Sequence, residues 1–422
     1  MLDIKFIKEN ADIVKNAIVK KHVSLDLNEL LTLDDTRAAL LQVIESMRAE
    51  QNRVSLDLGG KIETERRAQL IEEMRLVKDE LRVKEEEYAA IMMKWKELML
   101  QVPNVPDISV PDGDSDADNQ EIRHWGEKPE FAFDPKDHVE IMKALKMVDF
   151  ERGAKVHGFR GYYLTGPGAR LSFAIWQYAL DFFGGKEFIP VIPPVIVRKQ
   201  NLYGTGHLPG DVDDFYETQD GDVLAGTAEV PLMGMYADEI LDAASLPIRY
   251  LGFSPCFRRE AGSHSKDVKG LIRVHEFYKF EQLVLCEANH ETSVAFHEEL
   301  NRNTESFIES LGIPYRTVLN CGGDLGAGPV KKYDIELWVP KEGKYREISS
   351  ASYFHDFQTR RLNIRYRDEN GTLRYVHSLN STAIPTPRIL VSLIENCQRE
   401  DGSVAIPAPL VKYMGTDVIR AN

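Results

Sequence analysis

The densest set of residues that could do chemistry lies at 257–281, with the sequence FRREAGSHSKDVKGLIRVHEFYKFE. Charged residues gather at both ends, where the composition predicts two strands, and a long loop containing Gly and Ser separates them. Arginine at a strand end can hold a carboxylate or a phosphate in a fixed fork, and Phe277 offers a face on which a nucleobase could stack. A charged, solvated hairpin would have the same spacing, so this segment alone leaves both interpretations open.

Two shorter clusters could complete a site. In LAGTAEVPL, Thr227 and Glu229 stand in a small-residue turn before an apolar run, although a helix start with an acidic first turn would have the same pattern. In YREISSAS, Glu347 and Ser350 stand three residues apart in a polar run that a core strand would not choose. A carboxylate and a hydroxyl at this spacing could share a magnesium ion that bridges phosphates.

A fourth cluster is LNSTAIPTPRILVSLIENCQ, at 379–398. Its apolar spacing predicts a helix with Pro387 in the first turn. Arg388 then lies at the helix N-terminus, where a cation opposes the helix dipole at a cost in free energy. That cost suggests that Arg388 is placed to meet an anion, while an ordinary surface arginine is the alternative.

The elements that would position these residues begin after a different kind of segment. Two proline-free runs, 33–58 and 70–98, repeat a seam at alternating steps of four and three, as in a coiled coil. Gly59 and Gly60 lie between the runs and suit a reversal of the chain. We therefore expect two long helices folded back as an antiparallel hairpin. The seam positions are Leu33, Arg37, Leu40, Ile44, Met47, Gln51, Val54, Leu58, Leu70, Met74, Val77, Leu81, Lys84, Tyr88, Ile91, Trp95 and Leu98.

The chain then divides into three parts: residues 1–104 with the hairpin, a linker at 105–130 rich in Pro, Gly and Asp, and a large domain at 131–422. In the large domain, short β-rich runs alternate with helical stretches. This mixture predicts an α+β domain built on an antiparallel β-sheet. The β-rich runs are 188–197, 247–253, 282–286 and 332–339, and the helical stretches are 169–183, 288–310 and 387–398.

Composition excludes several classes of protein. The formal net charge of −15 argues against a general nucleic-acid coat, which needs clustered Lys and Arg. No stretch approaches the ~20 apolar residues of a membrane helix, and the charged N-terminus lacks the apolar core of a signal peptide. The cysteines form no CxxC pair, so neither a zinc site nor a disulfide framework is indicated, and we expect a cytoplasmic protein. They are Cys256, Cys286, Cys321 and Cys397.

Taken together, these residues resemble the seryl-tRNA synthetases of the ordinary bacterial type, which are class II aminoacyl-tRNA synthetases. FRREAG and GLIRVHEFYKFE resemble motif 2 of that class, and STAIPTPR resembles motif 3, with Arg388 as its arginine. FIPVIPP resembles motif 1 at the dimer interface, and TAEVPL, GTGHLP, GDLGAG and YREISSAS are further family signatures. The resemblance covers essentially the whole chain.

The resemblance implies a class II synthetase catalytic domain with an N-terminal coiled-coil arm. The implied activity is ATP-dependent attachment of serine to tRNA(Ser) through a seryl-adenylate, and also to tRNA(Sec), by a cytoplasmic homodimer that uses Mg²⁺ and no zinc. The arm would reach the long variable arm of the tRNA and serve the active site of the other subunit. A basic edge near its turn could contact RNA through shape and backbone, although solvated helix charges are the alternative. The edge comprises Lys61, Arg66, Arg67, Arg75 and Lys78.

The same resemblance implies roles for individual residues. Phe277 would stack on adenine and Arg388 on its opposite face, while Glu281 and Thr382 would bind the serine hydroxyl. The implied serine-binding residues are Thr227, Ala228, Glu229, Arg258, Glu281 and Thr382. The implied ATP-binding residues are Arg258, Arg259, Glu260, Arg273, Val274, Phe277, Glu347, Ile348, Ser349, Ser350 and Arg388. Glu347 and Ser350 would also hold Mg²⁺.

Three alternatives fit the sequence less well. A catalytically inactive paralogue would be expected to lose its key charged residues, and all of these are present: Arg258, Glu281, Glu347 and Arg388. An amino acid:carrier-protein ligase lacks the arm and uses zinc, and a coiled-coil scaffold would leave the four clusters unexplained. The chain departs from the family at Glu276, where Gln is usual, which adds a negative charge near the expected adenine site. Further departures are Gly226, Gly322, Tyr353 and His355.

Overall fold

The computed structural model describes the whole chain except residues 61–62, 211, 262–266, 268 and 422. The chain divides into two compact units. The first comprises Met1–Leu2, Lys20–His22 and Asn104–Asn422, and the second comprises Asp3–Val19 and Val23–Pro103. Within the described ranges, every helix is too short or too polar to cross a membrane.

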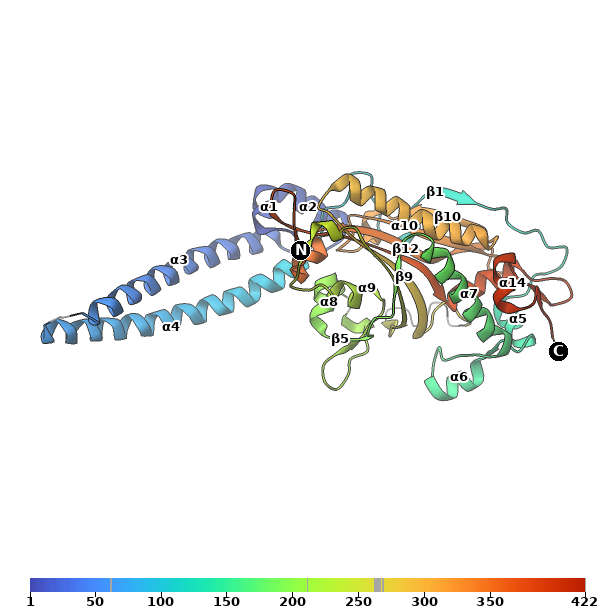
Figure 1. Cartoon of the computed structure of the whole chain (residues 1–422), viewed down its shortest axis with the longest axis horizontal. Helices are drawn as coiled ribbons and strands as arrows, with labels where there is room; N and C mark the ends of the chain where they lie inside the picture. The colour runs from blue at the N-terminus through green and yellow to red at the C-terminus, as the bar shows by residue number, and fades with distance from the viewer. Residues whose placement is uncertain (61–62, 211, 262–266, 268, 422) are drawn as a thin grey trace. The chain divides into compact units, whose positions relative to one another are not determined.

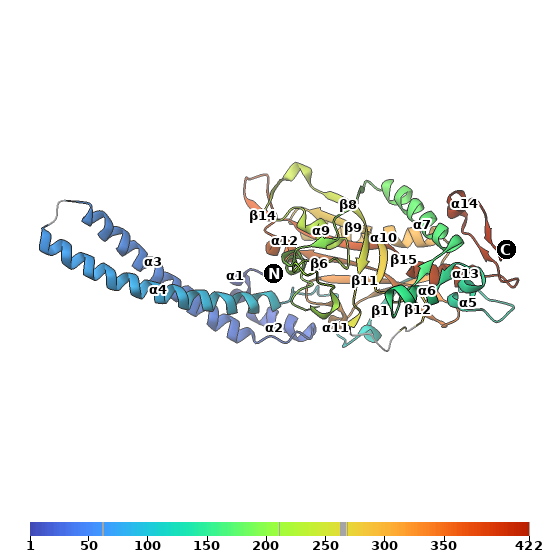
Figure 2. The same cartoon turned by 90° about the horizontal axis from the view of Figure 1, so that it is seen from below.

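The second unit is helical. Its long helices α3 and α4 lie side by side and antiparallel (Figures 1 and 2), as the heptad spacing predicts. Asp26 caps α3 by accepting hydrogen bonds from the backbone N–H groups of Asn28 and Glu29. The helices of this unit are α1 (Ile4–Glu9), α2 (Ala11–Lys20, whose last residue belongs to the first unit), α3 (Leu27–Leu58) and α4 (Thr64–Gln101).

The predicted seam of the hairpin is confirmed. Every seam position is buried or half-buried, while most positions between them are exposed. Arg37 shows how a polar seam residue is accommodated: its Nε donates to Asp34 at 2.9 Å, and its Cζ lies 5.1 Å from the centre of the Trp95 ring. Lys61 of the predicted basic edge lies outside the described residues.

The first unit is an α+β domain, as predicted, around an eight-stranded sheet of order β1-β10-β11-β12-β15-β9-β8-β4. Neighbouring strands are antiparallel except β4 and β8, which are parallel. The sheet strands are β1 (Gln120–Trp125), β4 (Ile189–Val191), β8 (Ile248–Phe257), β9 (Glu276–Cys286), β10 (Tyr315–Leu319), β11 (Lys331–Val339), β12 (Lys344–His355) and β15 (His377–Thr386).

Shorter strands and several helices surround this sheet. The shorter strands are β2 (Val148–Asp149), β3 (Tyr163–Leu164), β5 (Ile196–Val197), β6 (Val223–Leu224), β7 (Ile240–Asp242), β13 (Arg365–Arg367), β14 (Leu373–Tyr375), β16 (Val404–Ala405) and β17 (Val418–Ile419). The helices are α5 (His138–Ala144), α6 (Phe150–His157), α7 (Gly166–Gly184), α8 (Lys199–Thr205), α9 (Glu229–Gly234), α10 (His290–Ser310), α11 (Gly322–Leu325), α12 (Phe357–Leu362), α13 (Arg388–Asn396) and α14 (Ala408–Met414).

Helix α10 covers one face of the sheet and contacts β9, β12 and β15 (Figure 1). On β9, Gln282 points toward this helix: its Nε2 donates to the Leu300 carbonyl and to the Thr304 hydroxyl, both at 3.2 Å. Because side chains alternate along a strand, Lys279 and Glu281 point to the opposite face. That face carries the cavity described below.

Two sequence expectations need correction in detail. The β-rich run 188–197 forms two short strands, β4 and β5, because consecutive prolines at 193 and 194 cannot donate to a sheet. The expected linker, 105–130, contains β1, which pairs with β10 at the edge of the sheet. Most of β1 is exposed, which explains why its polar composition resembled a linker. The assignment of functions to the three parts of the chain stays a prediction.

Candidate active site

A cavity of about 350 Å³ opens on the face of the sheet opposite α10, within the range typical of small-molecule sites. Strands β9, β12 and β15 form its floor. The start of α9, the start of α13 and the loop at 326–329 form its walls. The four clusters singled out from the sequence therefore meet in one place.

Glu281 lies at the floor of the cavity with 2% of its surface exposed. The hydroxyls of Thr227 and Thr382 both donate to its Oε2, each at 3.4 Å, and Lys279 forms an ion pair with the same oxygen. Lys279 Nζ also donates to the Thr227 hydroxyl at 2.8 Å. Burial raises the pKa of Glu281, while Lys279 acts in the opposite direction. The cluster is a compact set of charges and hydroxyls suited to a small polar ligand.

A second buried carboxylate, Glu229, faces the same cavity. It is the first residue of α9, so the helix-start interpretation of this cluster is also correct. Gln358 Nε2 donates to Glu229 Oε1 at 2.6 Å, and burial raises the pKa of this carboxyl. Two carboxyl groups in one small cavity favour a ligand that brings a positive charge.

Arg258 and Phe277 form the next part of the wall. Arg258 directly follows β8, and its backbone N–H donates to the His275 carbonyl at 2.9 Å, which holds the two strand ends together. Its Nε donates to the Gly226 carbonyl at 3.3 Å, and its Cζ lies 5.3 Å from the centre of the Phe277 ring. The guanidinium is thus fixed between the carboxylate end of the cavity and an aromatic face.

Glu260 and Arg273 form an ion pair beside this wall. Burial alone would raise the pKa of Glu260, but Arg273, Arg258 and Arg388 outweigh burial and hold that pKa below its ordinary value. Glu260 is therefore a carboxylate near neutral pH. It can accept a hydrogen bond from a ligand amine without taking up a proton.

Arg388 begins α13 and closes the far side of the cavity. Its Nε donates to the Ile272 carbonyl at 2.9 Å, and its Nη1 donates to the Glu347 carbonyl at 3.2 Å. Burial lowers the pKa of Arg388, and the charge of Glu347 opposes that shift. Both backbone contacts fix the guanidinium at the cavity, and its contact with an anion stays a prediction.

Glu347 and Ser350 lie on β12, in the interior of the sheet, which corrects the expectation that a core strand would avoid this polar run. The run is tolerated because Glu347 is exposed and Ser350 half-buried at the cavity. Ser350 pairs in register with Asp334 of β11, whose pKa is raised by burial to about 6. Carboxylate and hydroxyl oxygens of this kind suit Mg²⁺.

Most of the predicted site residues line the cavity. They are Thr227, Glu229, Arg258, Glu260, Val274, Phe277, Glu281, Glu347, Ile348, Ser350, Thr382 and Arg388.

Four of the predicted residues do not line it, for different reasons. Ala228 packs into a hydrophobic core at the start of α9, and the side chain of Arg259 is exposed. Arg273 forms an ion pair with Glu260, which lines the cavity in its place. Ser349 points to the other face of β12, where its hydroxyl donates to the Thr382 carbonyl at 2.5 Å.

Sequence reasoning missed several residues of the wall. Lys279 and Asn380 line the cavity, and strand alternation could have found them, because each lies two residues from a predicted one, Glu281 and Thr382. His207 and the loop at 326–329 carry no such signal. His207 and residues 326–328 belong to family signatures that suggested no particular side-chain role.

Glu276 lies away from this cavity. It lines a second pocket together with Tyr162 and Tyr278, on the even-numbered side of β9. Phe277 lines the first cavity, so the two side chains point to opposite faces of β9, and the effect of the Glu276 charge on ATP binding stays a prediction.

Comparison with known proteins agrees with the fold. The family model of the seryl-tRNA synthetase N-terminal domain matches residues 1–106, and that of the tRNA synthetase class II core domain (G, H, P, S and T) matches residues 215–397. A serine--tRNA ligase of Deinococcus radiodurans is 47% identical over 416 residues, which cover 98% of each chain.

Solved structures show the same similarity. The seryl-tRNA synthetase of Pyrococcus horikoshii, crystallised with ATP, is 40% identical with a TM-score of 0.91 over 100% of both chains. The cytoplasmic serine-tRNA ligase of Naegleria fowleri, in complex with AMP, is 29% identical with a TM-score of 0.87, covering 100% of this chain and 99% of that one. On this similarity along its whole length, the chain belongs to the seryl-tRNA synthetase family.

Proposed function

We propose that this protein attaches serine to tRNA(Ser), and to tRNA(Sec), in the cytoplasm, with ATP as the energy source and seryl-adenylate as the intermediate. The observation that carries the proposal is the cavity floor, where a buried Glu281 is surrounded by Lys279 and two threonine hydroxyls. This floor adjoins a wall of arginines and an aromatic ring that suits a nucleotide. The names of the full-length relatives support the same activity.

Serine fits the carboxylate end of the cavity. Its ammonium would meet the negative charges of Glu229 and Glu281, its hydroxyl would donate to Glu281, and its carboxylate would face Arg258. Alanine would leave Glu281 without a ligand hydroxyl, and a site built to hydrogen-bond a substrate hydroxyl rejects the analogue that lacks it by roughly 10⁴-fold. Threonine must be excluded by the size of its methyl group.

The first step joins the serine carboxylate to ATP. A carboxylate oxygen attacks the α-phosphorus, the bond to the bridging oxygen breaks, and pyrophosphate leaves with that bond's electron pair. Attack at phosphorus needs positioning and charge neutralisation more than a protein nucleophile. Arg258 would bind the serine carboxylate and the α-phosphate, while Phe277 and Arg388 would enclose the adenine, with Glu260 accepting from its amino group.

The second step transfers serine to RNA. The terminal ribose hydroxyl of the tRNA attacks the activated carbonyl and gives up its proton to the AMP phosphate. The bond from the carbonyl carbon to the phosphate oxygen breaks, the ester to tRNA forms and AMP leaves. Donors fixed beforehand in a cavity stabilise the developing charge without reorganising. Arg258, whose position is set by backbone hydrogen bonds, is suited to stay on the phosphate through both steps.

Magnesium fits Glu347 and Ser350, which bring a carboxylate and a hydroxyl to the same wall beside the buried Asp334. Mg²⁺ commonly uses one or two carboxylates together with substrate phosphates and keeps several waters. When bound, it would neutralise phosphate charge and orient the pyrophosphate group.

We further propose a homodimer in which the helical arm binds the tRNA. Large apolar side chains are exposed on α7 and around β4, which matches the family's motif 1 interface, and a dimer would cover them. They are Phe173, Leu180, Ile189 and Ile192. Basic side chains on α4 near the hairpin turn are exposed and could contact phosphates.

Replacing Glu281 with Gln tests the serine site. We expect kcat/KM for serine in ATP–pyrophosphate exchange to fall by about 100-fold or more, because charge-assisted hydrogen bonds to the ligand are lost. The KM for ATP should change by less than about threefold. Glu276→Gln, on the other face of the same strand, is the matched control and should behave as the parent protein. Full serine activity of the Glu281→Gln variant would show that serine binds elsewhere.

Replacing Glu347 with Gln tests the magnesium site. The Mg²⁺ concentration for half-maximal exchange should rise roughly tenfold or more, because a direct ligand matters at least as much as an outer partner. Glu336→Gln is the control: Glu336 pairs with Glu347 in the sheet register but binds Arg316 at 2.5 Å instead of lining the cavity. An unchanged Mg²⁺ requirement in the Glu347→Gln variant would exclude this carboxylate as a ligand.

Changing Arg66, Arg67, Arg75 and Lys78 to Ala tests the arm. Exchange should be unaffected, while kcat/KM for tRNA should fall by about 10-fold or more and depend less on salt. In dimers mixed with Glu281→Gln subunits, charging should recover, because the intact arm of one subunit would serve the intact active site of the other. Recovery would fail if each arm served its own subunit, and undiminished charging by the basic-edge variant alone would remove these side chains from the RNA contact.

A further inference from the structure

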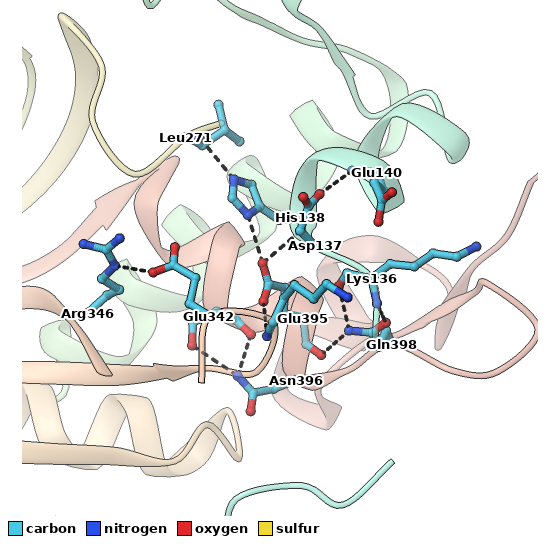
Figure 3. Close-up of polar contacts among 12 residues, drawn as sticks. Lys136, Asp137, His138, Glu140, Leu271, Glu342, Arg346, Glu395, Asn396 and Gln398 are labelled. Atoms are coloured by element: carbon cyan, nitrogen blue, oxygen red, sulfur yellow. Dashed lines mark hydrogen bonds and ion pairs between the residues drawn. The ribbon is translucent and has the colours of Figure 1, made fainter. Parts of the chain in front are cut away.

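A buried histidine and a buried glutamate contact each other (Figure 3), and neither lines the cavity. His138, the first residue of α5, is 5% exposed, and Glu395, on α13, is 1% exposed. Glu395 Oε1 accepts from the backbone N–H and from Nδ1 of His138, both at 2.9 Å. Its Oε2 accepts from the backbone N–H of Lys341 at 3.0 Å. One carboxylate therefore joins α5, α13 and the β11–β12 turn.

The second ring nitrogen of His138 has a partner in the motif 2 segment. The backbone N–H of Leu271 donates to His138 Nε2 at 3.3 Å. Because a backbone amide can only donate, Nε2 must carry no proton, and in a neutral imidazole the proton then lies on Nδ1, facing Glu395. Both nitrogens are therefore engaged, and the tautomer is set by the two partners.

The motif 2 segment fits closely against this ring. Gly270 has φ +81°, and a Cβ added to it would lie 2.1 Å from His138 Nε2, so a side chain has no room there. Leu271 and Ile272, the next two residues, line the cavity. The main chain at 270–272 therefore contacts the edge of the His138 ring on one side. On the other side it faces the wall of the cavity proposed to bind the nucleotide.

The contacts close into a ring. The Ile272 carbonyl accepts from Arg388 Nε at 2.9 Å, and Arg388 lies on α13, seven residues before Glu395. Seven residues are close to two turns, so both side chains emerge on the same side of the helix. Starting from Glu395 on α13, this closed loop of contacts runs through His138 and Leu271–Ile272 and returns to α13 at Arg388.

The chain before α5 is held independently of this histidine. Gln398 Oε1 accepts from the backbone N–H of Lys136 at 2.8 Å, and Gln398 Nε2 donates to the Lys136 carbonyl at 3.1 Å (Figure 3). Asp137 caps α5 by accepting from the Glu140 N–H at 2.8 Å. Since these bonds anchor the start of α5, a change at His138 acts mainly on what its ring touches.

We propose that His138 is a positioning residue of the nucleotide site. Its Nε2 sets the position of the Leu271–Ile272 main chain relative to Arg388. Its Nδ1 donates to Glu395, which fixes the orientation of the His138 ring. This inference rests on the proposed function, since Arg388, Leu271 and Ile272 line the part of the cavity assigned to ATP. A residue that only stabilised the fold would not affect the binding of ATP more than the binding of serine.

Two substitutions separate the two ring nitrogens. His138→Asn places an amide nitrogen near the Nδ1 position, so it keeps the donor to Glu395 and loses the acceptor for the Leu271 N–H. His138→Gln places a carbonyl oxygen near the Nε2 position, so it keeps the acceptor and loses the donor. Steady-state ATP–pyrophosphate exchange with the full-length protein gives the KM for ATP and for serine. Calorimetric titration with ATP alone gives the affinity without turnover.

His138→Asn is expected to raise the KM and the Kd for ATP about tenfold, the worth of one buried hydrogen bond, with the KM for serine changed by less than about twofold. His138→Gln should keep ATP binding within about threefold of the parent, although it should melt at a lower temperature because Glu395 loses a donor. In Gly270→Ala, the added Cβ would push the main chain at 270–272 away from the His138 ring. This variant should therefore reproduce the ATP-specific defect.

The inference is overturned if His138→Asn binds ATP like the parent, or if both variants weaken ATP and serine equally in proportion to their loss of melting temperature. It is also overturned if His138→Gln is the more defective of the two in ATP binding. A parent protein that showed no serine-dependent exchange would refute the proposed function instead, so the two failures are distinguishable.

Discussion

Strand β9 presents alternate side chains to opposite faces of the sheet, and the cavity depends on that alternation. Phe277, Lys279 and Glu281 face the ligand side, while Gln282 reaches α10 through hydrogen bonds to buried partners. A slip of one residue in register would exchange the two sets. The hydrogen bonds of Gln282 to α10 therefore hold the register of β9 that places the site residues. Gln282 has no exposed surface, so losing these partners would leave a buried amide unsatisfied, at a cost in free energy.

Charge is distributed unevenly along the cavity. Buried carboxylates gather at one end, where Lys279 partly compensates Glu281, and arginines gather toward the other, with Arg258 between them. A buried ion pair contributes little net stability, since desolvation offsets the attraction. The proposed ligands explain the arrangement better: an amino acid would bring an ammonium to one end and, through its carboxylate, a nucleotide phosphate toward the other.

The predictable parts are those whose signal is local. Heptad spacing located the hairpin, and the clustered motifs located the cavity, because each motif occupies one strand end or one helix start. Lys279 was missed although alternation pointed to it, and Ser349 was included although alternation excluded it. β1 was taken for a linker, since an exposed edge strand has no hydrophobic pattern. His138 was not found, because its partners Leu271 and Glu395 are distant in sequence and meet only through the fold.

The proposed function depends on the selection of serine by this cavity. ATP–pyrophosphate exchange by the full-length protein, run with each of the standard amino acids, measures that selection directly. Serine should support rapid exchange. Alanine should be activated roughly 10⁴-fold less efficiently, because it leaves the buried Glu281 without the ligand hydroxyl, and threonine should be rejected by the size of the site. Exchange with alanine or threonine at the serine rate, or no exchange with serine, would contradict the assignment of this cavity as a serine site.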